Sequence, residues 1–135
     1  MEIARVPFKR IGRTDLGMIF RPFIEVQLYA GNKREWILVE MLVDTGADYT
    51  MLPMRYAGIL GIDLNMDCKA KITSGIGGKE TMHMHGSLDI RIGAWQKKIP
   101  VGFLSRNDVP PLLGRLKCLE DLEVVMKNHE IIIKI

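Results

Sequence analysis

Residues 36–48 read WILVEMLVDTGAD, an apolar run that stops at an Asp-Thr-Gly tripeptide. Asp and Gly are poor strand formers, so we expect the chain to leave a β-sheet at Asp44. The turn would expose the Asp44 carboxylate, Thr45 can brace it through its hydroxyl, and Gly46 lets a reacting group approach the backbone without meeting a Cβ atom. The stretch therefore predicts a catalytic aspartate at the end of a strand.

An Asp-Thr-Gly sequence taken alone is also an ordinary turn, and the residues around it decide between the two interpretations. The apolar run precedes it, and residues 50–53, TMLP, follow it. The whole block resembles the active-site segment of the retropepsins, the retroviral-type aspartic proteases, whose pattern is two hydrophobic residues, Asp-Thr-Gly-Ala and then Leu-Pro. The resemblance implies catalytic roles for Asp44, Thr45 and Gly46. It also implies that Ala47 and Asp48 contact bound substrate.

Length and composition are those of one globular domain. The 135 residues suffice for a buried core and are too few for two pepsin-like lobes, so we expect a single domain over residues 1–135. With 47% hydrophobic and 26% charged residues and no apolar stretch of membrane-spanning length, the chain is expected to be soluble and to have no membrane partner. Residues 1–10 lack the features of a secretory signal, which predicts an intracellular, cytoplasmic protein.

The net charge of +3 does not by itself indicate a nucleic-acid partner, and none is expected. The basic residues are scattered and form no uninterrupted run longer than two, as at Lys97-Lys98, whereas nucleic-acid binding needs a clustered face or a recognisable module. Cys68 and Cys118 lie far apart in sequence and outside any Cys-x-x-Cys spacing. Free thiols are therefore expected, and neither a zinc site nor a disulfide framework.

Alternating apolar residues and glycine-containing turns predict an all-β fold with two short helices. The strands are expected at residues 23–29, 35–43, 69–72, 81–92, 96–104, 123–127 and 130–135. The first helix is expected over residues 54–60, with Pro53 suited to a first helical position and Gly61 to the stop. The second is expected over residues 116–122, where leucines form an apolar stripe. The retropepsin resemblance implies a closed β-barrel with one short C-terminal helix.

Both ends of the chain depart from the viral pattern, in which short terminal strands interleave between subunits. Residues 1–22 form an N-terminal extension, and residues 123–135 form an isoleucine-rich C-terminal hairpin. An exposed hairpin of this kind is an aggregation-prone edge. We therefore expect it to pair with a partner's copy or with the chain's own N-terminal segment, and the sequence leaves both alternatives open.

Residues 73–79, TSGIGGK, contain three glycines between two strand-like runs. They predict the tip of a long hairpin, with a flexible surface turn as the alternative. A phosphate-binding loop is disfavoured because a strand and not a helix follows. The segment is similar to the retropepsin flap, which closes over bound peptide and excludes water. The likeness implies main-chain contacts to substrate from the flap tip, namely Gly75, Ile76, Gly77 and Gly78.

Residues 110–115, PPLLGR, resemble the second signature of the family, two apolar residues followed by Gly-Arg. In the family the apolar pair packs beneath the catalytic turn. The resemblance implies that Leu112 belongs to the substrate site and that Gly114 and Arg115 support the turn. Arg115 is expected to pair with Asp48, because a planar guanidinium offers two parallel donors to a carboxylate. Two unrelated surface charges are the alternative.

His83 and His85 would share one face of a strand, where two imidazoles could bind a metal ion. A third ligand is not evident, and the neighbouring methionines favour core packing, so we expect neither a metal nor an organic cofactor. The walls of the substrate pocket are expected to be apolar. The expected wall residues are Val43, Tyr49, Met51, Ile76 and Leu112.

The chain carries one Asp-Thr-Gly, whereas peptide hydrolysis by this route needs two carboxyl groups. The resemblance therefore implies a homodimer in which each chain supplies Asp44, acting as an aspartic endopeptidase on peptide or protein substrates. Ala47 stands where pepsin-like enzymes often carry Ser or Thr, which predicts a pH optimum nearer neutral than pepsin's. A non-catalytic peptide-binding or dimerisation module on the same fold is the alternative. A nucleic-acid-binding β-barrel is disfavoured, because Trp36 and Trp95 are too isolated to stack bases.

Overall fold

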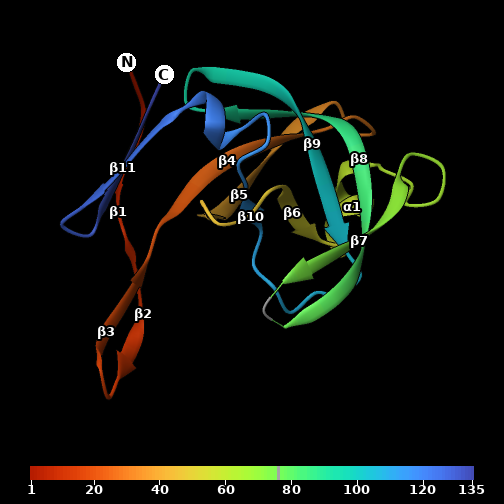
Figure 1. Cartoon of the computed structure of the whole chain (residues 1–135). Coiled ribbons are helices and arrows are strands. Elements are labelled where there is room, and N and C mark those ends of the chain that lie inside the picture. Colours follow the sequence, from red (N-terminus) through yellow and green to blue (C-terminus); the bar gives the residue numbers. More distant parts are fainter. Residues whose placement is uncertain (76) are drawn as a thin grey trace.

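The computed structural model describes residues 1–75 and 77–135, and most of this chain is extended strand (Figure 1). In the described part, the strands are interrupted by helix α1 (Arg55–Leu60) and by a short 3-10 helix, η1 (Leu119–Asp121). The strands are β1 (Glu2–Pro7), β2 (Lys9–Thr14), β3 (Gly17–Arg21), β4 (Phe23–Ala30), β5 (Glu35–Val43), β6 (Thr50–Pro53), β7 (Lys69–Gly75), β8 (Gly78–Ile92), β9 (Trp95–Leu104), β10 (Leu112–Leu113), β11 (Glu123–Lys127) and β12 (Glu130–Lys134). The expected mostly-β fold is confirmed, and the closed barrel stays a prediction.

The main sheet has seven strands in the order β4-β5-β10-β6-β9-β8-β7. Strand β4 pairs antiparallel with β5 along its length, as expected of a hairpin. It also pairs with β8, where Leu28 lies opposite Ile90, so the sheet curls back on itself. The short strand β10 runs parallel to β5 and antiparallel to β6. This insertion sets β10 beside the end of β5, where Asp44 follows.

One hydrophobic core packs against the sheet. Ile24, Val26 and Leu28 alternate along β4, and each is buried, as is Phe103 of β9. Fully burying such a side chain contributes about 1.5–3 kcal/mol. The burial also fixes the register of β4, because a slip of one residue would turn all three β4 side chains to the other face.

Helix α1 begins at Arg55, and Pro53 is the last residue of β6, so the expectation that Pro53 opens the helix is wrong. The strand continues to Pro53 because it pairs in parallel with β9, where Pro53 lies opposite Leu104. At the other end, Gly61 has a φ of +73°, and its amide donates to the Gly58 carbonyl at 3.2 Å. This left-handed residue confirms the expected stop.

The helix expected over residues 116–122 is replaced by a tight turn that contains η1. Lys117 has a φ of +55°, a left-handed conformation that a continuous α-helix does not contain. The neighbours Cys118 and Leu119 are both buried, whereas Leu116 is exposed. The helix predicted from the leucine spacing is therefore wrong, because two consecutive side chains, Cys118 and Leu119, are both buried in the core. Neither described helix is long and apolar enough to cross a membrane.

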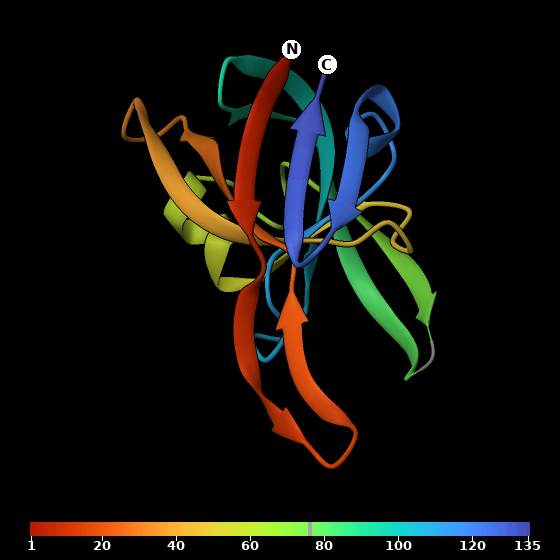
Figure 2. The ribbon, with the colours of Figure 1, turned by 90° about the vertical axis from the view of Figure 1, so that its left-hand side faces the viewer.

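A second sheet joins the two ends of the chain in the order β1-β12-β11. β11 and β12 form the expected terminal hairpin, and it turns at Asn128 and His129, whose φ values are +52° and +57°. Strand β1 covers the other edge of β12, with Val6 opposite Ile131. The hairpin thus pairs with the chain's own N-terminal strand, which decides between the two alternatives. The two ends of the chain consequently lie side by side (Figure 2).

Strands β2 and β3 form a separate two-stranded sheet between β1 and β4, called here the arm (residues 9–21). The arm stands away from the rest of the chain in both views (Figures 1 and 2). At its turn the Thr14 hydroxyl donates to the Gly17 carbonyl and accepts from the Leu16 amide, both at 3.1 Å. The expected N-terminal extension therefore contains two parts, β1 in the terminal sheet and the projecting arm.

Candidate active site

Asp44 follows the last residue of β5 and begins a tight turn. Its Oδ1 atom accepts a hydrogen bond from the Gly46 amide at 3.0 Å, and its carbonyl oxygen accepts one from the Ala47 amide at 3.2 Å. These bonds fold the chain back directly after the strand, as an Asx-turn does. Asp44 is partly exposed and Thr45 is exposed. The turn thus orients one carboxylate oxygen and leaves the group open to a reactant.

Strand β10 forms the base of this turn. Leu112 and Leu113 lie opposite Leu42 and Val43, and the Asp44 amide donates to the Leu113 carbonyl at 3.0 Å. Leu113 is completely buried, so it anchors the base in the core. The expected packing of the apolar pair beneath the turn is therefore present, and Asp44 is tied to a second strand in addition to its own.

The segment after β10 passes directly behind the segment after Asp44. A Cβ atom placed on Gly114 would lie 2.3 Å from the Tyr49 carbonyl oxygen, so only glycine fits there. The Gly114 amide donates to the hydroxyl of Thr50 at 3.1 Å, and Thr50 is buried. Thr50 was not among the residues predicted for the site. The sequence feature that could have indicated its role is a hydroxyl residue at the first position of an apolar strand.

Arg115 braces the turn from the side. Its Nη1 atom donates to the Thr45 carbonyl at 2.9 Å, and its Nη2 atom donates to the Asp48 carboxylate. Its backbone amide donates to the Ala47 carbonyl at 3.0 Å. The expected ion pair between Arg115 and Asp48 is present, although the Asp48 side chain is 74% exposed. An exposed pair contributes only about 0–1 kcal/mol, so its main effect is on geometry.

The glycine-rich segment forms the expected hairpin between β7 and β8. Gly75 lies opposite Gly78 across its tip, and Ile76 falls outside the described residues. Beneath the hairpin is a pocket of about 270 Å³, lined by hairpin residues on one side and by Met51, Leu104 and Arg106 on the other. The pocket is therefore apolar at Met51 and Leu104, and Lys79, Glu80 and Arg106 add charged side chains to its lining.

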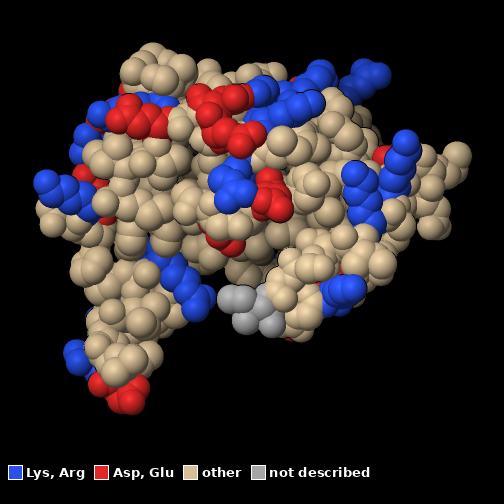
Figure 3. Space-filling view, in the orientation of Figure 1, with Lys and Arg blue, Asp and Glu red and all other residues tan. Residues whose placement is uncertain are grey.

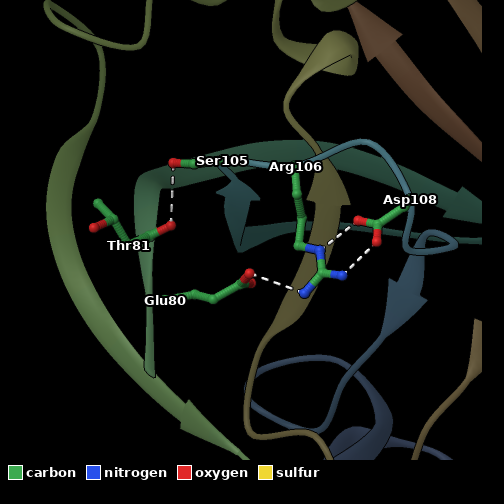
Figure 4. A network of polar contacts seen from close by, with 5 residues as sticks. All are labelled: Glu80, Thr81, Ser105, Arg106 and Asp108. Carbon is green, nitrogen blue, oxygen red and sulfur yellow. Dashed lines mark hydrogen bonds and ion pairs between the residues drawn. The ribbon is translucent and has the colours of Figure 1, made fainter. Parts of the chain in front are cut away.

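A polar network joins this hairpin to the loop after β9 (Figure 4). Arg106 donates to the Glu80 carboxylate at 3.0 Å and, through two nitrogens, to Asp108. The Ser105 hydroxyl donates to the Thr81 carbonyl at 3.3 Å. The Arg106 hydrogen bonds hold the pKa of Asp108 below its usual value. This network was not predicted from the sequence, because its members form no local motif.

The two histidines do not present a metal site. Both ring nitrogens of His85 lie 3.1 Å from backbone oxygens, those of Asp67 and Ser87. Over residues 1–75 and 77–135, no group of three His, Cys, Asp or Glu side chains is placed to hold a metal ion. Cys68 and Cys118 are free thiols, as expected.

The structure thus gathers the predicted site residues into two groups. The turn and its supports form the first group, which contains Asp44, Thr45, Gly46, Ala47, Asp48, Leu112, Gly114 and Arg115. The hairpin glycines and Met51 line the pocket of the second group. Tyr49 lines a separate pocket of about 220 Å³ beside Asp48, and Val43 packs in the core, so neither forms a wall of the pocket under the hairpin.

Comparison with protein families agrees with this arrangement. The family model described as gag-polyprotein putative aspartyl protease matches residues 34–116, from the start of β5 to just beyond Arg115. Because the match covers more than half of the chain, the chain belongs to this aspartyl protease family, and the retropepsin-like resemblance is confirmed. None of the curated proteins matches the chain.

Proposed function

We propose that this chain is an aspartic endopeptidase that acts as a homodimer, with one Asp44 supplied by each subunit. The observation that carries the proposal is the placement of Asp44, which is partly exposed and is oriented by the Gly46 amide and by β10. Membership of the aspartyl protease family supports the same chemistry. The chain contains a single Asp-Thr-Gly, so a second carboxyl group must come from a second chain.

In this mechanism the two Asp44 carboxyls lie about 3 Å apart across a two-fold axis and share one proton. The ionised carboxylate takes a proton from water, and the protonated one donates to the carbonyl oxygen of the scissile peptide bond. The hydroxide formed in this way attacks the carbonyl carbon and gives a tetrahedral diol. As the C–N bond breaks, the carboxyl that accepted the water proton passes it to the leaving amine, and a hydroxyl of the diol returns a proton to the other carboxylate. The pair titrates as a unit, so an activity profile reports two macroscopic pKa values.

The remaining site residues position substrate and dyad. The Thr45 hydroxyls of the two chains link beneath the dyad, and Ala47 and Asp48 contact the substrate main chain. Residues 75–78 close over the peptide and exclude water. Apolar side chains flanking the cleaved bond fit against Leu112 and the pocket that contains Met51.

Cleavage of a peptide library at a series of protein concentrations tests the proposal. Activity per chain should rise with concentration as the dimer forms, and a pepstatin-like inhibitor should block it. Asp44→Asn should reduce cleavage by about 10³-fold or more while leaving the fold intact. Asp63→Asn is a matched control, because the Asp63 carboxylate also accepts backbone amides in a turn far from the site. Equal activity of the two variants would refute the proposal.

A further inference from the structure

The arm is a two-stranded ribbon, and in the described chain its strands pair with each other and with no third strand. Nearly all of β2 is exposed, and large apolar side chains of the arm face water. These side chains are Ile11, Leu16 and Ile19, which are 44%, 93% and 38% exposed. An isolated two-stranded hairpin is marginally stable in water, and clustered exposed apolar residues mark contact surfaces. The arm therefore has the properties of a segment that becomes ordered against a partner.

The base of the arm lies beside the catalytic turn. The Val43 amide, one residue before Asp44, donates to the carbonyl of Pro22 at 2.9 Å, and Pro22 directly follows the arm. On the other strand of the arm, the Lys9 ammonium pairs with Glu40 at 2.7 Å. Two separate contacts thus fix where the arm leaves the body.

The base is also fastened to the terminal sheet. The Phe8 amide donates to the His129 carbonyl, and the Phe20 ring stacks on the His129 ring with centroids 4.2 Å apart. The aromatic stack and the hydrogen bond restrict rotation of the arm about its base. Figure 3 shows the arm standing apart from the body, with a hollow between them.

We infer that the arm of each chain packs against the body of a second copy of the same chain. The inference rests on the proposed function, because that function brings two Asp44 carboxyls to about 3 Å. The base of the arm adjoins Val43, so in such a dimer it lies within roughly 15 Å of the partner's own turn. A six-residue strand extends about 20 Å, which is long enough for the arm to run along the partner.

Charge decides which part of the partner the arm contacts. The arm has four basic residues, Lys9, Arg10, Arg13 and Arg21, and one acidic residue, Asp15. Its charge of +3 equals the net charge of the whole chain, so the other residues sum to zero. Two arms repel each other, whereas the body, whose charges sum to zero, does not repel an arm. The arm therefore packs on the body and not on the other arm.

A nucleic acid is the competing partner for a basic ribbon. Phosphate groups would be neutralised by the arginines and lysine alone, and such binding makes no use of Ile11, Leu16 and Ile19. A protein surface uses both the apolar and the basic side chains of the arm. The combination favours a second copy of this chain.

The first test compares dimer affinity in the inactive Asp44→Asn background, which prevents self-cleavage, by analytical ultracentrifugation. Leu16→Ser with Ile19→Ser should weaken the dimer by roughly tenfold or more, because two apolar contacts are lost. Leu38→Ser with Met66→Ser is the matched control, since these side chains are also exposed, at 59% and 86%, and lie outside the arm. Unchanged affinity in the arm variant, with circular dichroism showing that it is folded, overturns the inference.

The second test measures hydrogen exchange of the amides in residues 9–21 as the Asp44→Asn protein is concentrated. The arm should exchange quickly in the dilute monomer and slowly in the dimer. Equal exchange at both concentrations overturns the inference, as does protection by RNA or DNA alone. The readouts separate the two proposals. A wild-type dimer with a protected arm that cleaves no peptide refutes the endopeptidase, and an active wild-type dimer whose affinity does not change with the arm substitutions refutes the arm contact.

Discussion

Gly114 and Tyr49 approach so closely that a Cβ atom on Gly114 would overlap the Tyr49 carbonyl group, at 2.3 Å from both its carbon and its oxygen. At this point the segment after β10 passes behind the segment after Asp44. The separation of these two backbones therefore sets the position of the whole turn. Contacts with Thr50 and Arg115 then fix the turn from two further directions.

Substituting Gly114 tests this close approach. Gly114→Ala should push the two backbones apart, lower the free energy of unfolding by about 1–3 kcal/mol and abolish peptide cleavage. Denaturant unfolding and a cleavage assay measure the two effects. Gly58→Ala is the control, because an added Cβ there meets nothing within 4 Å and the site is inside α1, where alanine stabilises by up to about 1 kcal/mol. Similar effects of the two substitutions would contradict the argument.

The buried hydroxyl of Thr50 should be needed for stability. Thr50→Val nearly keeps the shape of the side chain and removes the acceptor of the Gly114 amide, leaving a buried donor unpaired. The expected loss is about 1–3 kcal/mol in the free energy of unfolding. Thr81→Val, at an exposed position, should change stability by less than about 0.5 kcal/mol. A neutral Thr50→Val would show that the hydroxyl does not support the site.

Arg115 should matter for catalysis more than for stability. Arg115→Lys keeps the charge, but a lysine cannot contact the Thr45 carbonyl and Asp48 with the same fork. We expect unfolding free energy to change by less than about 1 kcal/mol, because the pair is exposed, and kcat to fall roughly tenfold. Arg34→Lys, in an exposed turn, provides the control. A large loss of stability with unchanged kcat would reverse this assignment.

The network around Arg106 should control how the hairpin above the pocket binds peptide. Arg106→Gln and Glu80→Gln each remove the ion pair between the hairpin and the loop after β9, so KM should rise several-fold with little change in kcat. A double-mutant cycle is the decisive measurement, because the combined variant should be no worse than Arg106→Gln alone, which already removes the contacts with both Glu80 and Asp108. Fully additive effects would mean that the two side chains act separately.

Cys118 should make the fold sensitive to alkaline pH. Burial raises the pKa of its thiol from 9.0 to about 12, so the folded state retains a proton that the unfolded state loses above pH 9. The free energy of unfolding should therefore fall by up to about 1.4 kcal/mol per pH unit between pH 9 and about 12. In Cys118→Ala the free energy of unfolding, measured by denaturant unfolding at several pH values, should not show this fall with pH. An identical dependence of unfolding free energy on pH in the wild type and in Cys118→Ala would contradict the burial argument.

Local patterns predicted the parts of the molecule that depend on neighbouring residues. The strand that ends at Asp44, the left-handed stop at Gly61 and the turn at Asn128 all follow from alternation and turn chemistry, which act over a few positions. The ion pair between Arg115 and Asp48 was also predicted, because it accompanies a recognisable motif. These features required no knowledge of the tertiary arrangement.

Contacts between distant segments account for what the sequence did not reveal. The hydroxyl of Thr50 accepts from the Gly114 amide, and Arg106 donates to Glu80. The residues next to them in sequence form no pattern that predicts either contact. The leucine stripe over residues 116–122 has the spacing of a helix, yet the burial of Cys118 and the left-handed Lys117 give a tight turn. Tertiary packing overrode local propensity there.

The pairing of β1 with β12 determines when the terminal sheet can form during synthesis of the chain. These strands come from distant parts of the chain, so the terminal sheet cannot close until β12 has emerged from the ribosome. The base of the arm is fastened to the same sheet through Phe8 and His129. In a nascent chain the contacts of the arm with Val43 and Glu40 can therefore form before its contact with His129. If the chain is the proposed endopeptidase and the arm joins two subunits, the active dimer can form only after β12 has been translated.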